Sequence, residues 1–357
     1  MSRMLRVPRR WSDVDPAWMS AALSRRYPGI AVRDLQVGRV AEGTSSSARV
    51  TLSLAGGDGP TSVFVKGPGR PLHRAALVAL GALWTEARLA DAGVRFPLEH
   101  PAFFAGALDR RRATCVVVAE DLVAAGSRPF DPRTALSVDA VASGLCGLAA
   151  LHASYWERPL PAALGHLRPW RMGAALGAVS VASLSRGLRR AERLTAPGRV
   201  PHGVGARALS RQFRRSAAIA ASGPCTVLHG DPHPGNVYVT ADGRTGFFDW
   251  QLARRGQWSH DVGYFLAGSL GVEDRRRHER DLLGCYLDAV GRAGVRPPPL
   301  PVAWERYRGA PAFGLATWVH TLSFGTLQHA DVCLAMIRRF AAAYDDLETA
   351  RSDVAAP

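Results

Sequence analysis

The stretch VLHGDPHPGNVYVTADGRTGFFDWQLARRGQWSHD, residues 227–261, predicts more about this chain than any other segment. A short apolar run over 225–228 leads into its first polar turn, and two further apolar runs follow that turn. Between those two runs, the Asp-Gly pair at 242–243 supplies the positive φ that a tight hairpin turn needs. The pattern therefore predicts paired strands over 237–240 and 245–250.

Three oxygen-bearing side chains fall where these strands end. Asp231 and Asn236 lie on the loop that enters the hairpin, and Asp249 lies at its exit. Proteins typically hold magnesium through one or two oxygen ligands together with water and substrate phosphates, a role that Asn236 and Asp249 fit. Asp231 is then left to accept the proton of an attacking hydroxyl group, or to orient that group.

Other interpretations of these residues stand beside this one. Asp and Asn in turns commonly cap local backbone groups. A second chemical interpretation takes His229, Asp231 and His233 as the ligands of a hydrolase metal, but no third His or Cys ligand lies nearby in the sequence. We therefore expect His229 and His233 to bind backbone groups and hold the loop.

The same stretch resembles the aminoglycoside phosphotransferase and choline kinase-like family, small-molecule relatives of the protein kinases. The family signature is HGD-x-H-x-x-N followed by a D-x metal motif, and the matching residues here are His229, Gly230, Asp231, His233, Asn236, Asp249 and Trp250. The resemblance implies a kinase-like fold, the use of ATP and Mg²⁺, and a small-molecule acceptor with a hydroxyl group. It also implies that Asp261, at the start of the next helix, pins the backbone of the catalytic loop.

The charge of the chain has an unusual composition. The formal net charge is +15, which would ordinarily suggest a nucleic acid or an anionic surface as partner. Of the 45 basic residues, however, only Lys66 is a lysine. We interpret this bias as drift in genome composition, which argues against a nucleic-acid partner. An ammonium and a guanidinium are not interchangeable, so the retained lysine is informative.

The remaining composition indicates a globular protein, because 47% apolar residues suffice for sizeable cores. The following features of the sequence make the cytoplasm its expected compartment. The sequence has no apolar stretch long enough for a membrane span, and residues 1–11 lack the apolar region of a signal peptide. Five widely spaced cysteines, mostly within apolar segments, predict reduced, buried thiols rather than disulfides or zinc ligands.

Lys66 ends a β-type run at 61–65, which follows similar runs at 35–40 and 49–54. A loop of small residues joins the first two runs. Three antiparallel strands with such a loop predict a phosphate cradle, although the loop departs from GxGxxG. We expect Lys66 to reach the α- and β-phosphates of a nucleotide. The amides and hydroxyls expected at the terminal phosphates are those of Thr44, Ser45, Ser46 and Ser47.

Two further segments complete the expected nucleotide site. Apolar spacing over 74–92 predicts a helix containing Glu86, and the resemblance implies that this carboxylate partners Lys66. A predicted hairpin over 103–119 then runs into Glu120-Asp121-Leu122, which resembles the hinge that binds adenine through backbone groups. Glu120 and Leu122 are therefore expected beside the nucleotide.

These elements together predict an α+β, two-lobed protein-kinase-like fold. Residues 1–123 are expected to form a nucleotide-binding lobe with an antiparallel sheet, a helix, and a leading helix capped by Asp15. Residues 124–357 are expected to form a mainly helical catalytic and substrate-binding lobe around the catalytic hairpins. Further helices are predicted over 134–156, 273–293, 302–324 and 331–351.

Residues 186–215 carry nine arginines and one glutamate. By default such a segment is a solvated insert, with a cap over the acceptor site or a nucleic-acid contact as alternatives. The aromatic residues of the later helices are expected in the core rather than in an acceptor pocket. They are Trp304, Tyr307, Trp318 and Phe324.

The expected partner is a small molecule. Only eleven residues separate Asp249 from Asp261, too few for the activation segment of a protein kinase, so no protein substrate is expected. A basic second lobe, with carboxylates bunched only at 345–348, indicates a neutral or anionic acceptor. A catalytically silent nucleotide-binding regulator and a nucleic-acid-binding protein are the rival functions. The first is disfavoured because Lys66, Asp231, Asn236 and Asp249 are all present.

Overall fold

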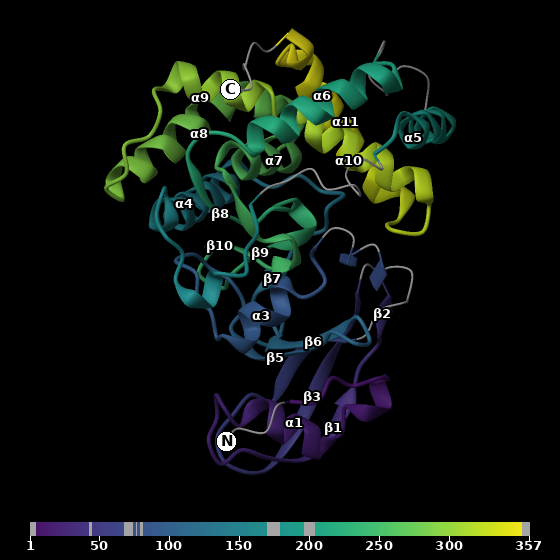
Figure 1. The fold of residues 1–357 in the computed structure, drawn as a ribbon, viewed down its shortest axis with the longest axis vertical. Helices are drawn as coiled ribbons and strands as arrows, with labels where there is room; N and C mark the ends of the chain where they lie inside the picture. The colour runs from purple at the N-terminus through teal and green to yellow at the C-terminus, as the bar shows by residue number, and fades with distance from the viewer. Residues whose placement is uncertain are drawn as a thin grey trace.

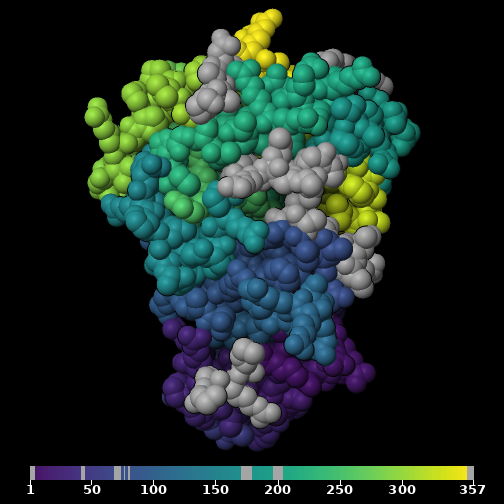
Figure 2. Space-filling view, in the orientation of Figure 1, coloured from purple at the N-terminus to yellow at the C-terminus, as the bar shows by residue number. Residues whose placement is uncertain are grey.

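The computed structural model describes residues 5–42, 45–67, 74–75, 77–78, 81–169, 179–195 and 204–351. The molecule is elongated, with the N-terminal sheet at one end and the C-terminal helices at the other (Figure 1). The space-filling view shows the same progression along the long axis (Figure 2). Because an antiparallel sheet dominates the first part and helices the second, the predicted α+β fold is confirmed.

The N-terminal sheet has the strand order β1-β3-β4-β6-β5, and the short strand β2 pairs with β3. Buried and more exposed side chains alternate along its strands, because one face packs against helix α1, Pro16–Leu23. Val50, Val63 and Val65 are fully buried in the core that includes this helix. Asp15 caps that helix by accepting a hydrogen bond from the Trp18 amide, as predicted. The strands are β1 Ala31–Val37, β2 Ala41–Glu42, β3 Ser46–Gly56, β4 Ser62–Gly67, β5 Phe103–Asp109 and β6 Thr114–Glu120.

The helix predicted over 74–92 is not continuous. Gly81 adopts a φ of +68°, a left-handed conformation that ends the first helical segment. Helix α3 then begins at Thr85 and runs to Asp91. Glu86 is therefore buried in the first turn of α3, beside the sheet that carries Lys66.

The C-terminal part contains eight α-helices among the described residues and two small sheets, with strand orders β10-β9-β7 and β11-β8. The helices are α4 Val138–Tyr155, α5 Val181–Leu194, α6 Ala206–Ala220, α7 Ser259–Ser269, α8 Val272–Arg292, α9 Leu300–Arg308, α10 Pro311–Phe324 and α11 Ala330–Asp346. The strands are β7 Arg128–Pro129, β8 Cys225–Leu228, β9 Val237–Val239, β10 Thr245–Phe247 and β11 Arg254–Gln257. The predicted helix over 302–324 is broken ahead of Pro311, because proline cannot continue a preceding helix.

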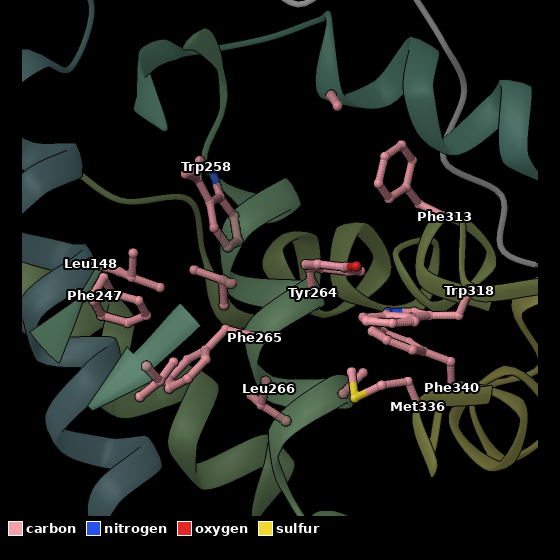
Figure 3. Close-up of a cluster of buried hydrophobic side chains, with 14 of the residues drawn as sticks. Leu148, Phe247, Trp258, Tyr264, Phe265, Leu266, Phe313, Trp318, Met336 and Phe340 are labelled. Atoms are coloured by element: carbon pink, nitrogen blue, oxygen red, sulfur yellow. The ribbon is translucent and has the colours of Figure 1, made fainter. Parts of the chain in front are cut away.

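Helix α7 lies at the centre of the C-terminal core, and every one of its residues is buried. Figure 3 shows Tyr264, Phe265 and Leu266 of this helix among aromatic side chains from the surrounding elements. The Tyr264 ring stacks on Phe340 of α11 with the ring centroids 5.1 Å apart. This packing fixes the helix that also carries Asp261.

The described part of the arginine-rich segment is not a solvated insert. It forms the amphipathic helices α5 and α6, both of which pack on α10. A Cβ placed on Gly187 would lie 2.0 Å from the Val319 carbonyl oxygen, so only glycine permits this approach of α5. The Phe213 ring of α6 stacks on Phe313 with the centroids 5.2 Å apart. Residues 196–203 lie outside the described residues.

The aromatic residues of the later helices divide between core and surface. Tyr307 and Trp318 are buried and Trp304 packs partly against the core, as expected. Phe324 is 50% exposed, so the expectation of a core position was wrong for that residue.

All five cysteines are free thiols. The expectation that they are buried was wrong for Cys146 and Cys285, which are exposed. Among the described helices, none combines the length and apolarity needed to cross a bilayer.

Candidate active site

Lys66, at the end of β4, lies between two carboxylates from distant parts of the chain. Its Nζ is 2.7 Å from Oε2 of Glu86 on α3 and 2.9 Å from Oδ1 of Asp249 after β10. Burial alone lowers the pKa of an ammonium, but the charges of Asp249 and Glu86 outweigh it and raise the pKa of Lys66. The lysine is therefore a permanent cation that ties sheet, helix and hairpin together.

Asp249 has an unusual backbone conformation, with φ 66° and ψ 67°. A non-glycine residue in this left-handed region costs about 1 kcal/mol or more, although Asp tolerates it better than most residues. The next residue is held in place because the Trp250 amide donates to Oε1 of Glu86 over 3.1 Å. The surroundings thus force the Asp249 carboxylate towards Lys66.

Asp231 and Asn236 occupy the loop between β8 and β9. The amide nitrogen of Asn236 donates to the backbone oxygen of Asp231 over 2.9 Å and to its Oδ2 over 3.3 Å. Burial, and then the nearby Asp249 charge, holds the pKa of the Asp231 carboxyl well above its usual range. These contacts use the nitrogen of Asn236 and leave its amide oxygen for other ligands.

One cavity of about 1080 Å³ joins these groups, because Lys66, Asp231, Asn236 and Asp249 all line it. It lies between the N-terminal sheet and the C-terminal helices. An amide oxygen and a carboxylate on one wall are hard oxygen donors, which are the ligands that Mg²⁺ prefers. The chemistry of Asn236 and Asp249 therefore fits a magnesium site.

Asp261, at the start of α7, is fully buried beneath the catalytic loop. Its carboxylate accepts from the amides of His229, over 2.6 Å, and Gly230, over 3.0 Å, and lies 3.4 Å from Nε2 of His152. Gly230 has φ +86°, and a Cβ there would lie 2.2 Å from the Leu252 carbonyl oxygen. The tight turn therefore requires glycine, and the buried carboxylate fixes its backbone.

The two histidines of the loop contact backbone groups. Nε2 of His229 lies 3.0 Å from the Phe248 carbonyl oxygen, and the Gly235 amide donates to Nδ1 of His233 over 3.0 Å. Burial lowers the pKa of His229 and lowers that of His233 to about 4, so both rings are neutral at physiological pH. These contacts favour support of the loop over the ligation of a hydrolase metal.

The serines expected at the phosphates face opposite sides of the sheet, because side chains alternate along a strand. Ser45 and Ser47 line the cavity, and Ser47 is the strand partner of Lys66. Ser46 points to the opposite face, where its buried hydroxyl accepts a hydrogen bond from Nε1 of Trp11 over 3.0 Å. The expected contact between the Ser46 hydroxyl and a phosphate is therefore wrong in this arrangement. Thr44 lies outside the described residues.

The expected hinge residues do not line this cavity in the described part of the chain. Glu120 binds the neighbouring Ala102 twice: its amide donates to the Ala102 oxygen over 2.9 Å, and its Oε2 accepts from the Ala102 amide over 3.0 Å. The carbonyl oxygen of Leu122 accepts from the Ser127 amide over 2.8 Å. A contact between this segment and adenine remains a prediction.

Sequence reasoning missed two side chains beside Asp231. The Tyr264 hydroxyl and the Arg254 guanidinium both lie close enough to the Asp231 carboxyl to influence its pKa. Tyr264 follows Asp261 by one helical turn and so lies on the same face of α7. That spacing was a usable signal, whereas nothing in the sequence places Arg254 near the loop.

Comparisons with known proteins agree with this geometry. The chain matches the family model described as the phosphotransferase enzyme family over residues 56–310. That match covers more than half of the sequence, and the chain belongs to this family. It is accordingly a phosphotransferase enzyme. No curated protein matches it in sequence.

Solved structures with a similar fold share little sequence with the chain. A candidate aminoglycoside phosphotransferase from Ralstonia eutropha JMP134 has a TM-score of 0.53 at 16% identity, covering 93% of this chain and 97% of that one. A choline/ethanolamine kinase family protein from Mesorhizobium loti has a TM-score of 0.46 at 17% identity, covering 89% and 90%. Choline kinase LicA from Streptococcus pneumoniae has a TM-score of 0.46 at 14% identity, covering 93% and 98%. The first of these supports the kinase-like fold.

Replacing Asp261 with Asn is expected to lower the unfolding free energy by about 3 kcal/mol at pH 7, because buried donors lose a charged acceptor. Although burial opposes ionisation, the hydrogen bond with His152 lowers the pKa of Asp261. Its stabilisation is therefore complete above the unfolded-state pKa of about 3.9 and is lost as the pH falls through the folded value.

Urea unfolding of wild type and Asp261→Asn between pH 7 and pH 3 measures the difference in their unfolding free energies. It should stay constant down to about pH 5 and shrink below about pH 4. A difference that grows on acidification would contradict the assignment.

Proposed function

We propose that this phosphotransferase moves the γ-phosphoryl group of ATP to a hydroxyl group of a small molecule with the help of Mg²⁺. The observation that carries the proposal is the meeting of Lys66, Asp231, Asn236 and Asp249 on one cavity. Phosphoryl transfer requires a cation for the nucleotide phosphates, oxygen ligands for a metal and a proton acceptor, and these residues supply all three.

In this proposal Asp231 accepts the proton of the acceptor hydroxyl. The hydroxyl oxygen attacks the γ-phosphorus, the bond to the bridging oxygen of ADP breaks, and the proton leaves through Asp231 to solvent. The raised pKa of Asp231 makes it a stronger base than a solvated carboxylate, and the hydrogen bond from Asn236 helps to fix its orientation. Its side chain is 24% exposed, which keeps it within reach of a substrate.

Lys66 holds the α- and β-phosphates, and Glu86 fixes the lysine by an ion pair of 2.7 Å. Asn236 and Asp249 would hold Mg²⁺, which when bound neutralises the charge of the phosphates. Ser45 and Ser47 line the same cavity, and we assign their hydroxyls to the terminal phosphates. Each residue of the site thus has a separate role, and most of the catalysis comes from positioning the nucleotide phosphates and the acceptor hydroxyl.

The cavity walls also bear on the charge of the acceptor. In the described part of the chain, its ionised side chains are Asp131, Asp231, Asp249, Asp331, Lys66 and Arg133. Arg133 is taken up by ion pairs to Asp131, at 2.5 Å, and to Asp331, at 3.1 Å. By contrast Asp346, in the acidic cluster near the C-terminus, pairs with arginines of α8. The sequence-based premise that carboxylates cluster only at residues 345–348 was therefore wrong. We propose a neutral or cationic acceptor rather than an anionic one.

The proposed function predicts which ligands stabilise the protein. ATP with Mg²⁺ should raise the melting temperature, because a ligand that binds only the folded state stabilises it by mass action. Duplex and single-stranded DNA at physiological salt should not. A screen of hydroxyl-bearing metabolites and antibiotics for ADP release then identifies the acceptor. Stabilisation by DNA, or by ATP without turnover on any acceptor, would favour a nucleic-acid-binding protein or a silent regulator.

Asp231→Asn should reduce turnover by about 10²- to 10⁴-fold, because it removes the proton acceptor but keeps the shape of the side chain. ATP affinity should change little. Asp242→Asn is the matched control, since that carboxylate lies on the exposed hairpin turn, with its side chain 61% exposed. Near-normal turnover in Asp231→Asn would exclude Asp231 from the chemistry.

Lys66→Arg should lose most activity while remaining folded, because a longer, forked guanidinium does not fit the space between Glu86 and Asp249. Glu86→Gln should show a smaller defect. The double variant should lose less than the sum of the two single losses, since both act on one ion pair. Initial rates and circular dichroism spectra provide the test, and full activity in Lys66→Arg would mean that the phosphate cradle is misplaced.

A further inference from the structure

Trp11 lies in a short 3-10 helix, Trp11–Asp13, ahead of the N-terminal sheet, and contacts two strands of the nucleotide site. Its indole Nε1 donates to the buried Ser46 hydroxyl over 3.0 Å. Its ring lies beside Gly67, where a Cβ would be 3.2 Å from the ring atom Cζ2. One side chain thus touches β3 by a hydrogen bond and β4 by packing.

The two contacted residues are strand partners. Ser46 pairs with Gly67, and the adjacent pair in the ladder is Ser47 with Lys66. Trp11 therefore acts one residue away from the proposed phosphate-binding lysine and from a serine on the cavity wall. Because side chains alternate along a strand, Ser46 and Ser47 face opposite sides, and Trp11 supports the cradle from behind.

We infer that Trp11 is a positioning residue for the nucleotide phosphates. It fixes the start of β3 at a set distance from Lys66. This inference rests on the proposed use of ATP. If it holds, nucleotide binding depends on a residue that precedes the sheet and is not among the described residues that line the cavity.

The segment around Trp11 is itself held by hydrogen bonds. The Arg9 amide donates to Oδ2 of Asp13 over 2.8 Å, and the Asp13 amide donates to the Arg10 carbonyl oxygen over 3.0 Å. These bonds close the 3-10 turn and restrict the directions that the indole can take. The Trp11 contact is therefore preorganised, so it can hold the cradle before a nucleotide binds.

Trp18 provides a matched control in the same region. Its indole Nε1 donates to the Arg6 carbonyl oxygen over 2.7 Å, so it makes the same type of bond. Its ring packs in the core under the sheet rather than behind the cradle. Trp18→Phe and Trp11→Phe each remove one indole hydrogen bond and keep an aromatic ring.

The test measures the affinity for ATP with Mg²⁺ by calorimetry, together with KM and kcat, in the full chain. Trp11→Phe should weaken ATP binding on the order of 5-fold, as expected for one lost hydrogen bond, and raise KM more than it lowers kcat. Ser46→Ala should give a similar loss, and the double variant should add little further. Trp18→Phe should lower the melting temperature at least as much, with ATP affinity unchanged.

Two results would overturn the inference. In the first, wild type binds ATP but Trp11→Phe and Ser46→Ala bind it equally well. In the second, Trp18→Phe loses affinity to the same extent as Trp11→Phe, which would reflect general loosening of the N-terminal region. Failure of the wild type to bind ATP is a different outcome, because it would refute the proposed function itself. If Trp11→Phe does not fold, Ser46→Ala decides alone.

Discussion

The ion pairs of Lys66 with Glu86 and Asp249 are the interaction on which the rest of the site depends. A buried ammonium is costly unless opposite charges compensate it, so the sheet, α3 and the hairpin after β10 must meet where the lysine ends. The meeting forces Asp249 into a left-handed conformation and brings Glu86 to the Trp250 amide. The same contact that joins the two parts of the chain therefore sets the geometry of the cavity between them.

A second buried charge organises the other side of the cavity. Asp261 accepts hydrogen bonds from the backbone amides of His229 and Gly230 in the catalytic loop. The position of Asp231 therefore depends on helix α7, whose residues are all buried. Tyr264 from the same helix lies near the Asp231 carboxyl. The residues proposed for chemistry thus lie on loops, while the residues that position them lie on rigid, buried elements, an arrangement that suits catalysis by preorganisation.

Local sequence patterns predicted the strands and the hairpin well because turn residues and alternating apolar residues act over short distances. They failed where distant contacts decided the outcome. The described part of the arginine-rich segment proved to be packed, since α10 offers an apolar face to its two helices. The break at Gly81 in the helix expected over 74–92 is by contrast a local effect of a glycine with positive φ. Ser46 was misassigned because the register between β3 and β4, which turns its hydroxyl towards Trp11, is not readable from a serine run.

The sequence by itself determined the chemical groups of the site and their order: one lysine on a strand, then Asp231, Asn236 and Asp249 at spacings that match a known motif. Only the tertiary structure decided which groups share a cavity and what charge that cavity carries, including the pairing of Arg133 with two aspartates. The physical reason is that residue identity and spacing are local properties. Burial, ion pairing and pKa shifts, by contrast, depend on neighbours that the folded chain brings together from distant positions.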